Sequence, residues 1–226
     1  MKTLVVSLFV CALMIGLSSQ GDAQVHFALG PKVGINFASA STEPSSPNIS
    51  GRTTILFGSA FELMFGKMFG VQLEPGYAMK GFSVDNITVQ SNAGPVAANA
   101  VVKYNEIQVP ILFKAKFLDG PVKPYVLAGP NLGIVASAKA TVSPAQGAQF
   151  EEQDIDIKES TSGMDFGLDF GGGAEFRLAQ GVSLTGDVRY SLGLSNLDDS
   201  TPQQGQPQGS TKTRGFQIQF GALFSL

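Results

Sequence analysis

Residues 164–178, MDFGLDFGGGAEFRL, constrain the fold more than any other stretch, because apolar and polar side chains alternate along almost all of it. The even-numbered positions carry Met, Phe, Leu or Ala apart from Gly172, and the odd-numbered positions carry Asp, Gly, Glu or Arg. Successive side chains of a β-strand point to opposite faces. The stretch therefore predicts a strand with one apolar face and one charged, glycine-lined face.

Seven further stretches predict strands of the same kind. They lie at residues 27–38, 53–65, 69–82, 101–117, 124–139, 182–195 and 214–226. Pro75 cannot donate a hydrogen bond to a neighbouring strand, so a bulge or local break is expected there. In residues 124–139, Tyr125 and Leu127 suggest one phase of the alternation and Leu132 and Ile134 the other. The faces of that strand are therefore left unassigned.

The connections between these strands alternate in length. Polar connections at residues 39–52, 83–100, 140–162 and 196–213 are long, whereas residues 66–68, 118–123 and 179–181 make short ones. Outer-membrane barrels show this asymmetry, with short periplasmic turns and longer external loops. The strands also exceed the roughly 9–11 residues that a tilted spanning strand needs. We predict an all-β fold, an eight-stranded antiparallel up-and-down transmembrane β-barrel with four long extracellular loops.

The first residues have the features of a secretory signal peptide. Lys2 precedes an apolar run at residues 4–17, and small residues end at Ala23. We expect a signal peptide at residues 1–23 and a barrel domain at residues 24–226. Cys11, the single cysteine, lies in the apolar run, so the exported chain should have no thiol for a disulfide or a metal. The net charge of −3 argues against a nucleic-acid partner, which requires a basic surface.

The polar faces of the strands are rich in glycine and alanine, which suits a narrow lumen better than a solvent-exposed surface. Their charges nearly balance, as a closed interior requires, because buried charges are tolerated when paired. We therefore expect the apolar faces to meet outer-membrane lipid and the charged side chains to form a structural network in the lumen. The expected members are Lys32, Glu62, Glu74, Lys80, Glu106, Lys114, Lys116, Asp165, Asp169, Glu175, Arg177, Asp187 and Arg189.

Aromatic residues gather beside the short connections and the C-terminus. An aromatic girdle at the periplasmic membrane interface would lie there. The residues expected in it are Phe65, Phe69, Phe117, Tyr125, Phe176 and Phe224.

Several segments resemble the outer-membrane β-barrel family often labelled "porin family" in Bacteroidetes-type bacteria. They are GPKVGINFA, LEPGYAMKGF, YNEIQVPILFKAKF, KPYVLAGPNLGI and GGGAEFRL, which together extend over nearly all of the chain after residue 23. The resemblance implies a small eight-stranded barrel in the bacterial outer membrane, and most members have no assigned activity. The last strand also resembles the signal read by the barrel-assembly machinery, although it ends in Leu226 where phenylalanine is usual.

Residues that carry chemistry are scarce. His26 is the single histidine and lies at the start of the first predicted strand, so a serine-histidine acyl-transfer site cannot be assembled in the long loops. The alternation continues through the glycines at residues 171–173, which favours a crowded lumen over a phosphate-binding loop. The acidic residues between Glu151 and Glu159 lack the spacing of a calcium loop. We predict no catalytic, cofactor or metal site.

The leading hypothesis is a structural or interaction protein of the outer membrane whose loops face outside and whose polar lumen is plugged. Residues 150–159 lie in the longest and most charged loop and are the expected working surface, for an external partner that the sequence does not identify. A small-molecule channel or transport component is one alternative. A secreted, lipocalin-like barrel with an apolar ligand inside is another. An enzyme ranks last.

Overall fold

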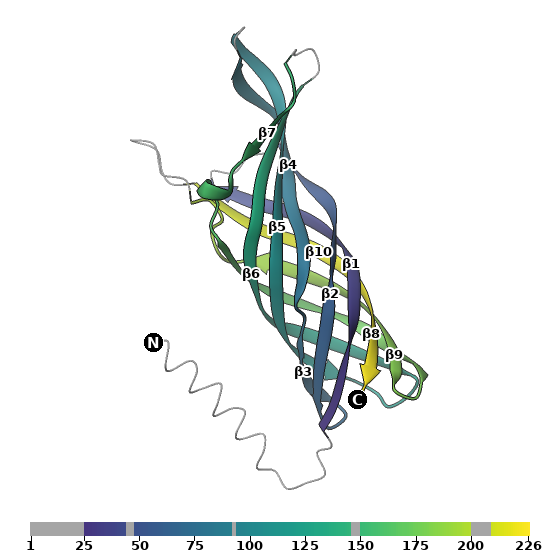
Figure 1. Ribbon diagram of the computed structural model, residues 1–226. Coiled ribbons are helices and arrows are strands. Elements are labelled where there is room, and N and C mark those ends of the chain that lie inside the picture. The colour runs from purple at the N-terminus through teal and green to yellow at the C-terminus, as the bar shows by residue number, and fades with distance from the viewer. Residues whose placement is uncertain (1–24, 44–47, 92–93, 146–149, 200–208) are drawn as a thin grey trace, which may run out of the picture.

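A computed structural model describes residues 25–43, 48–91, 94–145, 150–199 and 209–226. The signal-peptide prediction for residues 1–23, including Cys11, falls outside the described residues. Within them, antiparallel strands wind around a single barrel (Figure 1). The strands are β1 (Val25–Glu43), β2 (Ile49–Phe65), β3 (Phe69–Leu73), β4 (Gly76–Ser91), β5 (Gly94–Lys116), β6 (Val122–Pro144), β7 (Gln153–Asp156), β8 (Met164–Ala179), β9 (Val182–Gly193) and β10 (Ser210–Ser225), with a short 3-10 helix η1 (Lys158–Ser160) after β7.

The described residues contain ten labelled strands, and they form a ring of eight strand positions. β3 and β4 follow one another between β2 and β5, and the interruption falls at Glu74 and Pro75, as Pro75 predicts. β7 pairs only with the outer part of β6 and adds no position to the ring. β1 pairs with β2 on one side and with β10 on the other, which closes the barrel. The predicted all-β barrel is confirmed.

The strands extend further toward the long connections than the alternation suggested. β4 and β5 continue as a paired ribbon as far as Ser91 and Gly94, so most of the predicted loop at residues 83–100 is a β-hairpin. This ribbon projects beyond the body of the barrel at the top of Figure 1. The polar composition of residues 83–100 marked a connection exposed to solvent but did not show that its backbone is paired.

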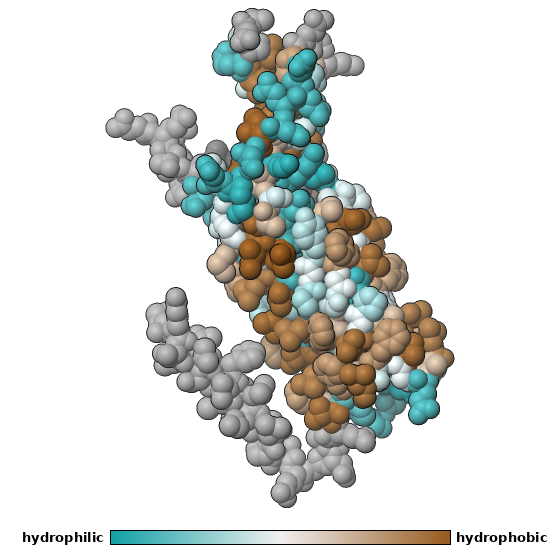
Figure 2. Space-filling view, in the orientation of Figure 1, coloured by the Kyte–Doolittle hydropathy of each residue, from teal (hydrophilic) through white to brown (hydrophobic). Residues whose placement is uncertain are grey.

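The apolar faces of the strands point outward. Val33, Ile35 and Phe37 on β1 are about half exposed, and Phe216 and Phe220 on β10 are more than half exposed. Figure 2 shows hydrophobic side chains over the lower body of the barrel and hydrophilic ones over the projecting end. Such an outward band is expected where hydrocarbon replaces water. In the described residues, no helix is long and apolar enough to cross a membrane.

β6 follows one phase from Tyr125 to Val135, with odd-numbered residues inward and even-numbered residues outward. Tyr125 and Leu127 therefore lie inside the barrel, each 3% exposed, whereas Leu132 and Ile134 face out. An irregularity in the pairing with β5 follows Val135 and shifts the phase. Tyr125 was wrongly expected in the aromatic girdle. The sequence pattern was ambiguous because these two inward residues are largely apolar.

Glycine on the inner face of β8 permits close approach of β9. A Cβ at Gly171 would lie 2.2 Å from the carbonyl oxygen of Val188 and 3.0 Å from Cγ of Arg189. A Cβ at Gly173 would lie 2.1 Å from the carbonyl oxygen of Gly186. Side chains at these positions are therefore excluded by crowding, which makes a phosphate-loop role unnecessary to explain the glycines.

Candidate functional site

The lumen is filled in layers, and the layer nearest the short turns is built around Glu62. Lys114 Nζ lies 2.7 Å from Glu62 Oε2, and Lys116 Nζ lies 2.6 Å from Glu62 Oε1. Lys116 also contacts Glu175 Oε2 at 2.5 Å. Lys114 Nζ lies 3.9 Å from the ring centroid of Tyr125, within the range of a cation–π interaction. Strands β2, β5, β6 and β8 are thereby joined across the lumen.

A second layer surrounds Glu74, at the break between β3 and β4. Arg189 of β9 reaches it with two nitrogens, at 2.6 and 2.8 Å, and contacts Asp187 Oδ1 through Nε at 2.5 Å. Lys32 of β1 bridges the same two carboxylates at 2.9 and 3.0 Å. The Tyr125 hydroxyl donates to Asp187 Oδ2 at 2.8 Å. Bidentate guanidinium pairs are among the strongest hydrogen-bonded contacts in proteins, so this layer fixes the centre of the barrel.

A third layer lies closer to the long connections. Lys80 Nζ contacts Glu106 Oε2 at 2.7 Å and Asp165 Oδ2 at 2.9 Å. Asp165 also accepts hydrogen bonds from the hydroxyls of Ser195 and Thr213, at 2.7 and 2.9 Å. Asp169 is 1% exposed. It accepts from Ser191 at 2.6 Å and Asn131 at 3.1 Å. Hydroxyl and amide donors thus supplement lysine in this layer.

Above the charged layers, the inner face of the strands becomes apolar. Lys80 and Phe82 are successive inward residues of β4, and Glu106 and Tyr104 are successive inward residues of β5. The rings of Phe82 and Tyr104 lie 6.4 Å apart between centroids. The buried members of this outer apolar layer are Ala40, Phe82, Tyr104, Val135, Ala138 and Leu197, and Ile49, Val84, Val102 and Ile157 pack against it.

Two long connections supply the lid of the outer apolar layer. Leu197 follows β9 and is 1% exposed, and Ile157 precedes η1. The two segments are joined by a hydrogen bond from Ser162 N to the Leu197 carbonyl at 2.9 Å and by an antiparallel bridge between Thr161 and Asp198. Residues of the predicted external loops therefore fold inward and close this end of the lumen.

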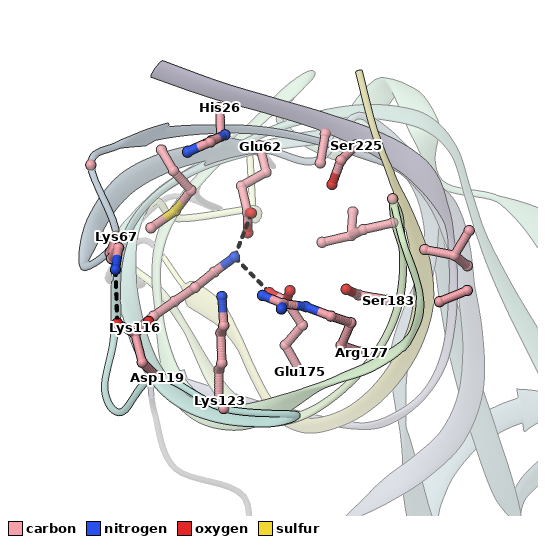
Figure 3. A pocket seen from close by; sticks show the side chains of 18 residues that line it. His26, Glu62, Lys67, Lys116, Asp119, Lys123, Glu175, Arg177, Ser183 and Ser225 are labelled. Atoms are coloured by element: carbon pink, nitrogen blue, oxygen red, sulfur yellow. Dashed lines mark hydrogen bonds and ion pairs between the residues drawn. The ribbon is translucent and has the colours of Figure 1, made fainter. Parts of the chain in front are cut away.

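The end of the barrel at the short turns is open. A cavity of about 470 Å³ lies there, and its lining includes the inner-layer residues Glu62, Lys116 and Glu175. Figure 3 looks into this vestibule and shows Lys123 and Arg177 directed toward its centre beside Lys116. Lys67 and Asp119, on two neighbouring turns, form an exposed ion pair at 3.2 Å on its rim.

The structure buries twelve of the thirteen predicted lumen residues and leaves one, Arg177, exposed at the vestibule. It brings Glu62, Lys114, Lys116 and Glu175 together in the first layer, Lys32, Glu74, Asp187 and Arg189 in the second, and Lys80, Glu106 and Asp165 in the third. Asp169 lies near this third group without a cation within ion-pair distance among the described residues.

Sequence reasoning missed several contributors to the lumen, and Tyr125, Asn131 and Leu197 show three different reasons. Tyr125 was assigned to lipid, and Asn131 was not considered because its strand had no assigned faces. Leu197 lies in a connection with no periodic pattern, so no local signal marks it as buried. If the odd-numbered residues from Tyr125 to Val135 had been assigned to the inner face, Tyr125 and Asn131 would have been identified.

His26 lies on the vestibule, at the end of the barrel where the sequence placed it. The lining also carries the hydroxyls of Ser183 and Ser225, but no hydrogen bond between His26 and either serine is present in the described residues. Acidic residues of the long loop are engaged locally: Asp154 accepts from Thr141 at 2.7 Å, and Asp156 accepts from the Lys158 backbone N–H at 2.9 Å. No group of three His, Cys, Asp or Glu residues in the described ranges could hold a metal ion.

Residues 18–199 match the family model described as outer membrane protein beta-barrel domain. The match extends over most of the chain, so this protein belongs to that family of outer-membrane β-barrels and is located in the bacterial outer membrane. The charged interior and the family membership argue against the alternative of a secreted barrel with an apolar ligand inside. The narrower resemblance to Bacteroidetes-type members stays a prediction.

One similar solved structure reaches a TM-score of 0.50, and two others match with lower scores. The chain is similar to a major outer membrane protein from Thermus thermophilus, with 15% identity, a TM-score of 0.50, and coverage of 90% of this chain and 100% of that one. It is also similar to Neisserial surface protein A, with 14% identity, a TM-score of 0.47 and coverage of 88% and 97%. OprG from Pseudomonas aeruginosa matches with 14% identity, a TM-score of 0.47 and coverage of 92% and 98%. No curated protein matches the chain.

Proposed function

We propose that this protein is a non-conducting outer-membrane anchor that presents its long connections at the cell surface. The observation that supports the proposal is the sequence of layers in the lumen. Three layers of paired charges are followed by the outer apolar layer around Leu197. An ion that crossed the barrel would have to displace buried ion pairs and then enter an apolar layer, and both steps are costly for a charge.

The size of the ring supports the same proposal. Eight strands enclose an interior just wide enough for side chains to fill it, whereas water-filled channels use about sixteen or more. The largest side chains that are buried almost completely include Arg189 and Lys114, both of which extend across this interior. The network of charged side chains is therefore proposed to act structurally, by joining strands that are far apart in the sequence.

The proposed contact surface consists of the projecting β4–β5 ribbon and the neighbouring loop that contains β7. Glu151 and Glu152 are exposed there, whereas Ile157 belongs to the packing of the outer apolar layer. The expected working surface at residues 150–159 therefore divides into an exposed part and an anchoring part. Exchange of residues 150–156 for a Gly-Ser linker should preserve the heat-dependent mobility of the barrel in SDS gels. Loss of that mobility shift would mean that these residues are needed for folding.

The last strand is proposed to be recognised by the barrel-assembly machinery. β10 presents Phe216, Phe220 and Phe224 outward, and it completes the ring by pairing with β1. Truncation of Leu226 should leave membrane insertion unchanged, whereas Phe224→Ser should reduce it. Equal insertion of the wild type and the Phe224→Ser variant would contradict this role.

No catalytic role is proposed, because the histidine and serines on the vestibule are not joined by hydrogen bonds. Conductance tests the anchor function directly. Purified barrel inserted into planar bilayers should give no steady current steps above the lipid baseline. Large and persistent conductance from the monomer would overturn the proposal and favour the channel alternative.

A further inference from the structure

The vestibule at the short-turn end has more cations than its carboxylates neutralise. Its lining contains Lys67, Lys116, Lys123 and Arg177 as cations and Glu62, Asp119 and Glu175 as anions. Every one of these three carboxylates already has an ion-pair partner: Asp119 pairs with Lys67, and Glu62 and Glu175 pair with Lys116. Within the described residues, Lys123 and Arg177 have no carboxylate within ion-pair distance.

The two unpaired cations belong to strands that lie side by side. Lys123 of β6 pairs in register with Glu175 of β8, two residues before Arg177. Figure 3 shows both side chains directed into the vestibule and not toward the outer surface of the barrel. Lys116 stands next to them at the inner end of the cavity and is only 7% exposed. Lys123 and Arg177 therefore face one open vestibule, with the carboxylate-paired Lys116 at its inner end.

The chemistry of this convergence fits an oxyanion. Arginine offers a planar fork of donors that matches phosphate or carboxylate oxygens, and lysine adds a compact charge. Ser183 and Ser225 bring hydroxyl groups to the same lining, which can donate further hydrogen bonds. A volume of about 470 Å³ is within the range of small-molecule sites and exceeds what a single phosphate group would fill.

We propose that the vestibule binds a small, multiply charged anion of the periplasm that carries phosphate or carboxylate groups. Arg177 and Lys123 contact the anion, and Lys116 stabilises it from the inner end. A free solute is favoured over a lipid headgroup because these side chains point into the barrel, away from the apolar outer face. This inference goes beyond the anchor role and does not depend on whether the barrel conducts.

The probe for this site is inorganic pyrophosphate, titrated calorimetrically into the full barrel in an uncharged maltoside detergent at constant ionic strength. The Lys123→Gln/Arg177→Gln variant should bind pyrophosphate about tenfold or more weakly, since charged hydrogen bonds are lost. A matched control is Lys212→Gln/Arg214→Gln, which removes the same two residue types from exposed positions at the other end of the barrel. The control should bind pyrophosphate as the wild type does.

Two outcomes would overturn the proposal: absence of binding to the wild type at millimolar pyrophosphate, or equal weakening in both double variants, which would indicate a general effect of net charge. The heat-dependent gel shift shows that each variant is folded. Citrate in place of pyrophosphate tests whether carboxylates are accepted as well as phosphates. The pyrophosphate titration is repeated with the barrel in nanodiscs that contain phosphatidylglycerol. Weaker binding of pyrophosphate there would mean that an anionic lipid headgroup, and not a free solute, occupies the vestibule.

Discussion

The two ends of the lumen differ in what fills them. At the long-connection end, Leu197 and Ile157 fold inward and pack with the apolar strand residues of the outer apolar layer. At the short-turn end, the turns are too brief to fold back, and the charged inner layer faces an open vestibule. Both ends are built on the same strands. The inward residues of the strands are apolar at one end and charged at the other, and only the apolar end also receives side chains from long connections.

The largest loss of folding free energy is expected for substitutions in the buried charged layer at the centre of the lumen. Arg189→Met leaves Glu74 and Asp187 with one lysine between them, and removal of one member of a buried ion pair costs about 3–5 kcal/mol of folding free energy. Lys67→Met, which breaks the exposed rim pair with Asp119, should cost less than about 1 kcal/mol. Urea unfolding in lipid vesicles measures both, and a similar cost for the two variants would contradict the layered account.

A smaller effect is expected at the closed end. Leu197→Ala should cost about 2–3 kcal/mol, at the low end of the range for buried leucine, because a connection relaxes around the space more easily than a strand. The matched control is Leu194→Ala, whose side chain is 42% exposed. Hydrogen exchange of β6 amides should rise near Val135 in the first variant alone. Equal exchange in both variants would show that Leu197 does not seal the lumen.

The smallest effect is expected at the open end. Lys123→Gln/Arg177→Gln removes two charges that form no ion pair within the described residues, so its unfolding free energy should stay within about 0.5 kcal/mol of the wild type. The same urea titration measures it. A loss comparable with that of Arg189→Met would mean that the vestibule belongs to the structural network, and the contrast between the two ends would fail.

Period-two alternation was sufficient to predict the barrel and most of its strands. It assigns a side chain to a face but does not give its height along the barrel, and so it could not join Glu74 to Arg189, which lie 115 residues apart. It failed at Tyr125 and Leu127, where inward positions carry largely apolar side chains. It had no access to Leu197, because burial in a connection depends on tertiary packing. The side chain of Arg177 faces inward, as the alternation predicted. It is nevertheless exposed, because it lies at the open end of the lumen.

Thiol labelling of two alanine-to-cysteine variants tests the central claim most directly, since the described residues contain no cysteine. Ala138→Cys places a thiol in the outer apolar layer, where the alanine is 0% exposed, and Ala179→Cys places one on the open vestibule. With a charged maleimide and the folded barrel, we expect rapid labelling at residue 179 and protection at residue 138 until the protein is unfolded. Equally rapid labelling at both positions would contradict the account, because it would require water at the end of the lumen that we describe as closed.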